Sequence, residues 1–456
     1  MSQHHIPGWA RDAVFYHLYP LGTCGAPRRN DHASPPVPRL GALRPWLEHA
    51  RDLGATAVLL GPVFESTEHG YDTADYLVVD RRLGELGDLA ELCTAARRLG
   101  LRVVLDGVFH HVGRQFWAFR DLLQHGEGSR YRHWFSNVRF GGRSPLGDPF
   151  VYDAWHGHYT LVKLDVGNPE VRQHLFEVVS TWVRELGIDG LRLDAADSLD
   201  RRFQRALSRH CREQHPDLWL MGEVIHGDYR RWVHPRQLHS TTNYELYKGL
   251  WSSHVDHNYF ELAHSLDRQS GPEGLYRDLR LYTFADNHDV PRVATKLREA
   301  GHLRPLYALL LTMPGIPSIY YGSEWGIHGD TGGGHDWDLR PALDLAAVER
   351  HPHPRLVEDI RRLIALRHEL TALRRGDYRT VHLASEQLVF LRGHPHGSAL
   401  VAVNSASRPV VVDLDVDELG TSSLRDALAP GEPVEVREGR ARVELPPCWA
   451  RVLVAG

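Results

Sequence analysis

Cysteine is scarce in this chain, and long apolar runs are missing from it. The four cysteines, Cys24, Cys93, Cys211 and Cys448, are widely spaced and form no Cys-x-x-Cys pair, which argues against a disulfide framework and a zinc knuckle. No window approaches about 18 uninterrupted apolar residues, and the first residues lack the basic region and apolar stretch of a signal peptide. We therefore expect reduced cysteines, no membrane contact and a cytoplasmic location.

An excess of charge of either sign is also missing. The 53 basic and 58 acidic residues give a formal net charge of −5, and no basic run is long enough to follow a phosphate backbone. We expect no nucleic-acid partner. The 42% of hydrophobic and 24% of charged residues are ordinary globular usage, and a chain of 456 residues is long enough to bury a large core.

Eight short runs of β-branched and aromatic residues recur along the chain, and most are followed by a polar turn and a segment of helical period. The runs are Ala13 to Pro20, Ala57 to Val63, Arg102 to Phe109, Gly190 to Ala195, Leu218 to Val224, Ser240 to Glu245, Tyr282 to Asp289 and Ser318 to Glu324. This alternation is typical of βα units around a parallel sheet. No Gly-x-Gly-x-x-Gly turn follows the first run, so the pattern of eight strands favours a closed (β/α)8 TIM barrel over a doubly wound sheet.

Two segments depart from this pattern. Between the third run and a helix expected over Asn168 to Leu186, about fifty residues rich in aromatics, Gly and Pro are too many for an ordinary βα loop. They predict an inserted subdomain at 112–164, within a barrel of residues 1–111 and 165–375. After Arg375, alternating runs such as QLVFLRG and PVVVDLDV predict a C-terminal antiparallel β-sandwich over 376–456. The aromatics expected in the core of the subdomain are Trp117, Trp134, Phe135, Trp155 and Tyr159.

Carboxylates follow three of the expected strands. Asp194, Glu223 and Asp289 stand at the carboxyl ends of the fourth, fifth and seventh strands, where barrel enzymes hold their reacting groups. One such residue alone is as readily a helix cap or a turn residue. Adjacent strands, however, place Asp194 and Glu223 side by side, and a separation of roughly 5 to 5.5 Å is typical of retaining glycosidic cleavage. Arg192, on the same strand face as Asp194, would hold that carboxyl ionised.

Four segments resemble the α-amylase superfamily, glycoside hydrolase family 13. They are DGVFHH at 106–111, GLRLDAAD at 190–197, GEV at 222–224 and FADNHD at 284–289, in the order that the family has them. HGYDTADY at 69–76, LVKLDVGNPEV at 161–171 and MPGIPSIYYGSEWG at 313–326 support them. The resemblance extends from about Ala13 to the C-terminus and implies the same barrel.

The resemblance also implies the roles of individual residues. It makes Asp194 the nucleophile, Glu223 the general acid/base, and Asp289 a third carboxylate that binds sugar hydroxyls and stabilises the transition state. His111 and His288 match histidines that hydrogen-bond the sugar being cleaved.

Further positions would bind substrate. Tyr71 matches an aromatic platform whose ring stacks on the C–H face of a pyranose. Asp336 and Arg340 resemble a pair that binds the next sugar toward the nonreducing end. Two positions stay open: His69 either contacts sugar or shapes the loop after strand two, and Trp251 is either a platform for leaving-group sugars or a packing aromatic.

The chain departs from the family pattern at two places. Where many secreted amylases have an Asn that supports calcium, this chain has His110 followed by His111. Calcium prefers oxygen ligands and imidazole offers nitrogen, so we predict no metal there, and we expect no cofactor. Asp197 and Ser198 stand where the family often has Lys-His, so the leaving-group preference should differ from that of long-chain starch amylases.

The segment YDAWHGHYTLVKL looks most like the cyclomaltodextrinase, neopullulanase and maltogenic amylase group. Those relatives usually carry an additional N-terminal β-domain, which we expect this chain to lack because its first strand begins near Ala13; a homodimer stays an open option. The expected function is retaining hydrolysis of α-1,4-glucosidic bonds in malto-oligosaccharides or cyclic α-glucans, such as cyclomaltodextrins and cyclic maltosyl-maltose. The alternatives are a transglycosylase or a sucrose/trehalose-type isomerase on the same intermediate, and a catalytically inactive sugar-binding protein.

Overall fold

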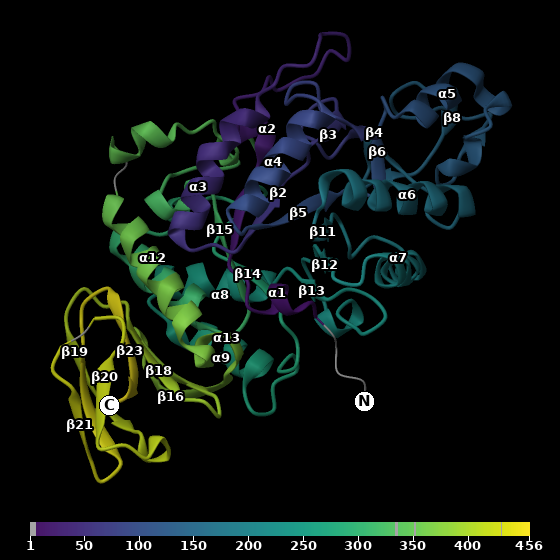
Figure 1. Cartoon of the computed structure of the whole chain (residues 1–456). Helices are drawn as coiled ribbons and strands as arrows, with labels where there is room; N and C mark the ends of the chain where they lie inside the picture. Colours follow the sequence, from purple (N-terminus) through teal and green to yellow (C-terminus); the bar gives the residue numbers. More distant parts are fainter. Residues whose placement is uncertain (1–5, 333–335, 351–352, 430) are drawn as a thin grey trace.

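Eight parallel strands form the centre of the structure, a computed structural model that describes residues 6–332, 336–350, 353–429 and 431–456 (Figure 1). The strands are β1 (Phe15–Leu18), β2 (Ala57–Leu60), β5 (Arg102–Gly107), β11 (Gly190–Leu193), β12 (Trp219–Gly222), β13 (Ser240–Thr241), β14 (Tyr282–Phe284) and β15 (Ile316–Tyr320). Hydrogen bonds join them in the order β13-β12-β11-β5-β2-β1-β15-β14. A parallel bridge between Thr242 and Tyr282 connects the two edges. The predicted TIM barrel is confirmed.

Helices surround these strands. The longer ones are α3 (Arg44–Leu53), α4 (Leu86–Arg98), α6 (Pro169–Leu186), α7 (Arg201–Gln214), α8 (Tyr244–Val255), α9 (Tyr259–Ser270), α11 (Leu303–Thr312) and α12 (Pro354–Glu369), and the shorter ones are α1 (Gly8–Arg11), α2 (Pro20–Thr23), α10 (Val293–Lys296) and α13 (Thr371–Arg375). The helix predicted from Asn168 shows how the sequence sets its own boundaries. The Asn168 side chain accepts a hydrogen bond from the Glu170 N–H at 2.8 Å, and Gly187 ends the helix with a left-handed φ of 62°.

Several strands end earlier than the sequence predicts. The run Ser240 to Glu245 contains only the two-residue strand β13, because the Asn243 side chain accepts a hydrogen bond from the Leu246 N–H at 3.1 Å and caps α8. In the run Tyr282 to Asp289, β14 ends at Phe284, and Asp286 accepts from the Val293 N–H at 2.8 Å. Polar side chains beyond the carboxyl ends therefore bind backbone N–H groups at the starts of the helices that follow, and these strands end early.

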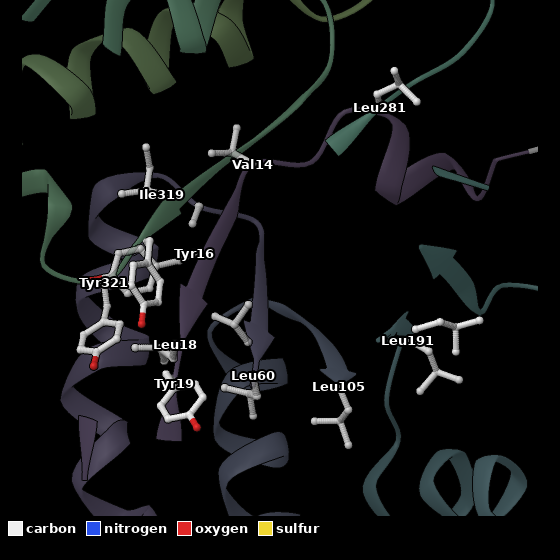
Figure 2. Packing of buried hydrophobic residues seen from close by; sticks show 14 of the residues in the cluster. Val14, Tyr16, Leu18, Tyr19, Leu60, Leu105, Leu191, Leu281, Ile319 and Tyr321 are labelled. Carbon is white, nitrogen blue, oxygen red and sulfur yellow. The ribbon is translucent and has the colours of Figure 1, made fainter. Parts of the chain in front are cut away.

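Side chains along the barrel strands alternate between two apolar cores. Tyr16, Leu18, Leu60, Leu105 and Leu191 are buried in the larger core, which the surrounding helices share (Figure 2). The intervening strand residues fill the barrel interior: Phe15, Leu59, Val104, Trp219 and Met221 belong to this second core. Successive strand residues point to opposite faces, so the interior receives every second side chain of each strand.

The residues between β5 and α6 form a small insertion. A three-stranded sheet of β6 (His111–Gly113), β10 (His158–Lys163) and β9 (Ala154–Trp155) accompanies the pair β7 (Arg139–Phe140) and β8 (Phe150–Val151) and helix α5 (Trp117–His125). Trp134 and Phe135 are buried there, and Trp117 and Tyr159 pack against the core. The prediction for Trp155 is wrong: this residue lies on the edge strand β9 and is only partly buried, at a cavity described below.

The C-terminal part is an eight-stranded antiparallel sheet, as predicted. Its strands are β16 (Asp377–Leu383), β17 (Gln387–Gly393), β18 (Ala399–Asn404), β19 (Val410–Asp415), β20 (Ser423–Asp426), β21 (Val434–Arg437), β22 (Arg440–Leu445) and β23 (Trp449–Ala455). They enclose an apolar core of their own and lie beside α9 (Figure 1). Within the described residues, all four cysteines are free, and no helix has the length and apolarity that crossing a bilayer requires.

Candidate active site

Inward-facing positions of two barrel strands, β5 and β12, change from apolar to charged toward the carboxyl ends. On β5, Val104 lies in the barrel interior and Asp106 follows two residues later. On β12, Met221 lies in the interior and Glu223 comes directly after the strand. Because side chains two residues apart point to the same face, the strand period itself delivers these carboxylates to the top of the barrel.

The guanidinium of Arg192 lies at the centre of this charged cluster. Its Nη1 atom donates to both carboxylate oxygens of Asp106 at 2.7 Å and lies 3.3 Å from Oδ1 of Asp194. Its Nη2 atom lies 3.0 Å from Oε2 of Glu223, which also accepts a hydrogen bond from the Ala195 N–H at 3.1 Å. One buried cation therefore holds Asp194 and Glu223, from paired strands, next to each other.

Burial raises the pKa of both carboxyls of this pair. For Asp194 the rise in pKa is large, and the charge of Glu223 adds to it. Arg192 opposes this rise without cancelling it, so the expectation that Arg192 by itself keeps Asp194 ionised is not met. For Glu223, burial is again the main cause of the raised pKa, Arg192 opposes it and Asp289 adds to it. Two buried carboxyls that repel each other titrate as a unit and keep one proton between them above the ordinary carboxyl range. Such a pair offers a proton donor and a nucleophile at the same time.

Asp289 behaves in the opposite way. Burial acts to raise its pKa, but the charges of His288, Arg340 and Arg192 outweigh burial, and the pKa is lowered. Its Oδ2 atom lies 2.9 Å from Nε2 of His288, and its Oδ1 atom accepts from Nη2 of Arg340 at 2.9 Å. The same Arg340 nitrogen donates to Asp336 at 3.1 Å. Asp289 is thus held ionised, as an acceptor of hydrogen bonds.

Tyr71 and two histidines complete the wall of the site. The Tyr71 hydroxyl donates to Asp106 at 2.9 Å and contacts His288, and the Tyr71 N–H donates to Nδ1 of His69 at 3.2 Å. Nε2 of His111 lies 3.9 Å from Oδ2 of Asp194. Burial lowers the pKa of His111 to about 3, so its imidazole is neutral and can donate or accept a hydrogen bond.

A cavity of about 770 Å³ opens above these groups. Most of the predicted site residues line it: His69, Tyr71, His111, Asp194, Glu223, Asp289, Asp336 and Arg340. Arg192 and His288 lie directly behind them, in contact with the lining carboxylates. Trp251 is not among the described residues of the lining, and its ring instead faces Nζ of Lys296 at 4.3 Å.

Sequence reasoning assigned no site role to several other residues of the lining. Those with aromatic, imidazole or aliphatic side chains are Trp155, His156, His158, Leu161, Ala195, Ile225, His226, Tyr244 and Val290. Ile225, His226 and Val290 could have been found, because they follow Glu223 and Asp289 directly. Tyr244 follows the weak sixth strand, and its hydroxyl accepts from Asn287 at 3.1 Å and donates to Glu223 at 3.5 Å. Trp155 and the two histidines come from the β9–β10 hairpin, which only the fold brings over the barrel.

A pair of imidazoles occupies the place where the sequence resemblance would put a calcium-supporting Asn. Nδ1 of His110 lies 3.2 Å from Nδ1 of His111, and burial lowers the pKa of His110 to about 4. The neighbouring lysine Lys163 adds positive charge here. Nitrogen donors and a cation suit calcium poorly, and the absence of calcium at this place stays a prediction.

Three comparisons place the chain among known proteins. The model of the α-amylase catalytic domain matches residues 43–355. Neopullulanase 2 of Thermoactinomyces vulgaris is 32% identical over 472 residues, covering 99% of this chain and 79% of that protein. A cyclomaltodextrinase of Geobacillus thermopakistaniensis is 28% identical over 478 residues, covering 97% and 76%.

A solved structure agrees with these sequences. The cyclic α-maltosyl-(1→6)-maltose hydrolase of Arthrobacter globiformis, in complex with cyclic α-maltosyl-(1→6)-maltose, superposes with a TM-score of 0.82 at 27% identity. The match covers 99% of this chain and all of the other. With the family match over more than half of its length, the chain belongs to the α-amylase family, glycoside hydrolase family 13, and is a glycoside hydrolase.

Proposed function

We propose that this glycoside hydrolase cleaves α-1,4-glucosidic bonds of short malto-oligosaccharides or cyclic α-glucans with retention of anomeric configuration. The observation that carries the proposal is the contact of Asp194 and Glu223 with one guanidinium, that of Arg192, below a cavity. The substrate class is supported by the names of the relatives, which refer to pullulan, cyclomaltodextrins and cyclic maltosyl-maltose.

The first step is formation of a glycosyl-enzyme ester. Glu223 gives its proton to the glycosidic oxygen, the bond from that oxygen to the anomeric carbon breaks, and an Asp194 oxygen bonds to the carbon. The raised pKa of the pair keeps the required proton in place. Arg192 contacts both side chains, so its positive charge balances Asp194 before this step and the ionised Glu223 after it.

The second step is hydrolysis of that ester. Glu223, now ionised, takes a proton from water, whose oxygen attacks the anomeric carbon and releases Asp194. Asp289 accepts hydrogen bonds from sugar hydroxyls, and its negative charge stabilises the positive charge on the ring in both transition states. Tyr71 presents its ring to the same sugar.

The pH dependence of kcat/KM should be bell-shaped with a displaced alkaline limb. Because burial raises the pKa of Glu223 above its ordinary 4.5, the rate should fall only as the pH rises through this higher value and removes the proton. At low pH the rate should fall because the pair takes up a second proton and Asp194 is no longer ionised; burial and the charge of Glu223 raise the pKa of Asp194, so this limb is displaced upward as well. Initial rates with maltotriose between about pH 4 and 9 test this. An alkaline limb at or below 4.5 would contradict a raised pKa of Glu223.

A panel of substrates tests the linkage and the outcome. Maltotriose, pullulan, cyclomaltodextrins and a cyclic maltosyl-maltose tetrasaccharide are incubated with the full chain, and early products are resolved by chromatography and proton NMR. We expect one new reducing end for each bond broken, initially as the α-anomer. A β-anomer would overturn retention, products without new reducing ends would indicate transglycosylation or isomerisation, and no turnover at all would favour a sugar-binding protein.

We also propose that the enzyme acts in the cytoplasm. All four cysteines are free, as is usual in a reducing compartment. Fractionation of the source cells, with antibody detection of the chain, tests this location.

A further inference from the structure

A second cluster of charged side chains lies away from the cavity, where the barrel meets the C-terminal sheet. His257 comes just after the end of α8, and Glu299 and His302 belong to the segment that leads into α11. Glu386 comes just before β17 of the C-terminal sheet. One nitrogen of each histidine and one oxygen of Glu299 all lie within 4.8 Å of one another. Segments far apart in sequence thus bring two imidazoles and a carboxylate together.

The spacing of these atoms suits a zinc ion. Nε2 of His257 lies 3.3 Å from Oε1 of Glu299, and Nε2 of His302 lies 3.8 Å from Oε2 of Glu299. In a tetrahedral zinc site with bonds of about 2.0 to 2.2 Å, neighbouring ligand atoms are roughly 3.3 to 3.5 Å apart. His257 and Glu299 already have this spacing, and a small rotation of the half-exposed Glu299 side chain would bring its second oxygen closer to the buried His302.

The orientation of His257 also suits a metal ligand. Its other ring nitrogen, Nδ1, lies 2.9 Å from Oε1 of Glu386. A carboxylate that accepts the N–H of a histidine fixes the tautomer and leaves the opposite nitrogen free to bind a metal. His302 would exchange its present hydrogen bond from Nε2 to the Ser405 carbonyl, 3.1 Å long, for the metal.

The neighbouring histidine does not compete for the ion. His254 is buried, with Nδ1 against the Leu250 carbonyl at 2.6 Å and Nε2 against the Tyr259 hydroxyl at 2.9 Å. Glu299 and Glu386 bring two negative charges beside the imidazoles of His257 and His302, and a divalent cation would balance this charge.

We propose that His257, Glu299 and His302 bind one Zn²⁺, with water as the fourth ligand and Glu386 orienting His257. Two imidazoles and one carboxylate form a donor set that favours zinc over calcium or magnesium. Because the three ligands belong to the barrel and Glu386 belongs to the C-terminal sheet, the ion fastens the two parts of the molecule together. The site is distinct from the cavity of Asp194 and Glu223.

Zinc titration of the full chain tests the proposal. The protein is treated with EDTA, dialysed and titrated with ZnCl₂ by calorimetry, and its melting temperature is followed in parallel. We expect His257→Ala and Glu299→Gln to bind one zinc fewer per chain than wild type and to lose the zinc-dependent rise in melting temperature. Glu386→Gln should weaken binding roughly 10-fold or more.

Both principal variants change half-exposed side chains, so they should fold. His396→Ala, an exposed histidine between β17 and β18, is the matched control and should bind zinc as wild type does. Equal zinc binding by wild type and His257→Ala would overturn the site, as would a wild type that binds no zinc. Hydrolysis of maltotriose by His257→Ala should stay at the wild-type rate, so failure here is separable from failure of the proposed function.

Discussion

Replacing Glu223 with glutamine should lower kcat for maltotriose by roughly three powers of ten or more, because the amide cannot donate a proton and cannot activate water. Glutamine has the size of glutamate and keeps an oxygen for the Ala195 N–H, which now bonds Oε2. The variant therefore removes proton transfer by residue 223 and keeps the side-chain volume at this position. Steady-state release of reducing sugar measures the effect.

An activated substrate separates the two roles of Glu223. The nitrophenolate of a nitrophenyl α-maltoside leaves without being protonated. Glu223→Gln should therefore still form the glycosyl-enzyme from this substrate and stop at that intermediate. Azide should then restore turnover and give an α-configured maltosyl azide, since it attacks from the side that water uses. Asp197→Asn is the matched control, because Asp197 lines the same cavity and is exposed; it should stay within about ten-fold of wild type. If Glu223→Gln hydrolysed maltotriose within about ten-fold of the wild-type kcat, the assignment of Glu223 as the general acid/base would be wrong.

Replacing Asp194 with alanine should lower kcat by about four powers of ten or more, because no covalent intermediate can form. The smaller side chain leaves space beside Arg192, whose Nη1 atom now lies 3.3 Å from Asp194. With α-maltosyl fluoride as substrate, azide should enter that space and displace fluoride. The product should be β-configured, opposite to that of Glu223→Gln.

The pair of azide products is the sharpest check on the assignment. An α-configured azide from Asp194→Ala would place the nucleophile elsewhere in the cavity. Asp289 is the alternative carboxylate, but its lowered pKa and its contacts with His288 and Arg340 favour a hydrogen-bonding role. Circular dichroism and melting temperature of each variant confirm that the fold is retained.

Much of the architecture could be predicted because short-range rules govern it. The eight apolar runs and the helices between them determine a βα repeat, and the helix from Asn168 begins and ends at its own capping residues. The strand period of two places Asp106 above Val104 and Glu223 above Met221, whatever lies further away in the chain. The order of the strands, and the end of the barrel at which the site lies, follow from connection rules alone.

Other features depended on packing between distant segments. Sequence spacing could not show whether Trp251 or Tyr244, on the same helix, faces the cavity; the structure turns Tyr244 to it and sets Trp251 against Lys296. Nor could it show that the β9–β10 hairpin carries Trp155 over the barrel.

By itself, the sequence determined the barrel, the C-terminal antiparallel sheet and the strand ends that carry the carboxylates, because strand alternation and parallel pairing act over a few residues. Only the tertiary structure decided which residues line the cavity and that Arg192 contacts both Asp194 and Glu223. It also decided that His257 contacts Glu299 and Glu386. Those contacts join residues far apart in the chain, and their geometry is set by how whole helices and strands pack.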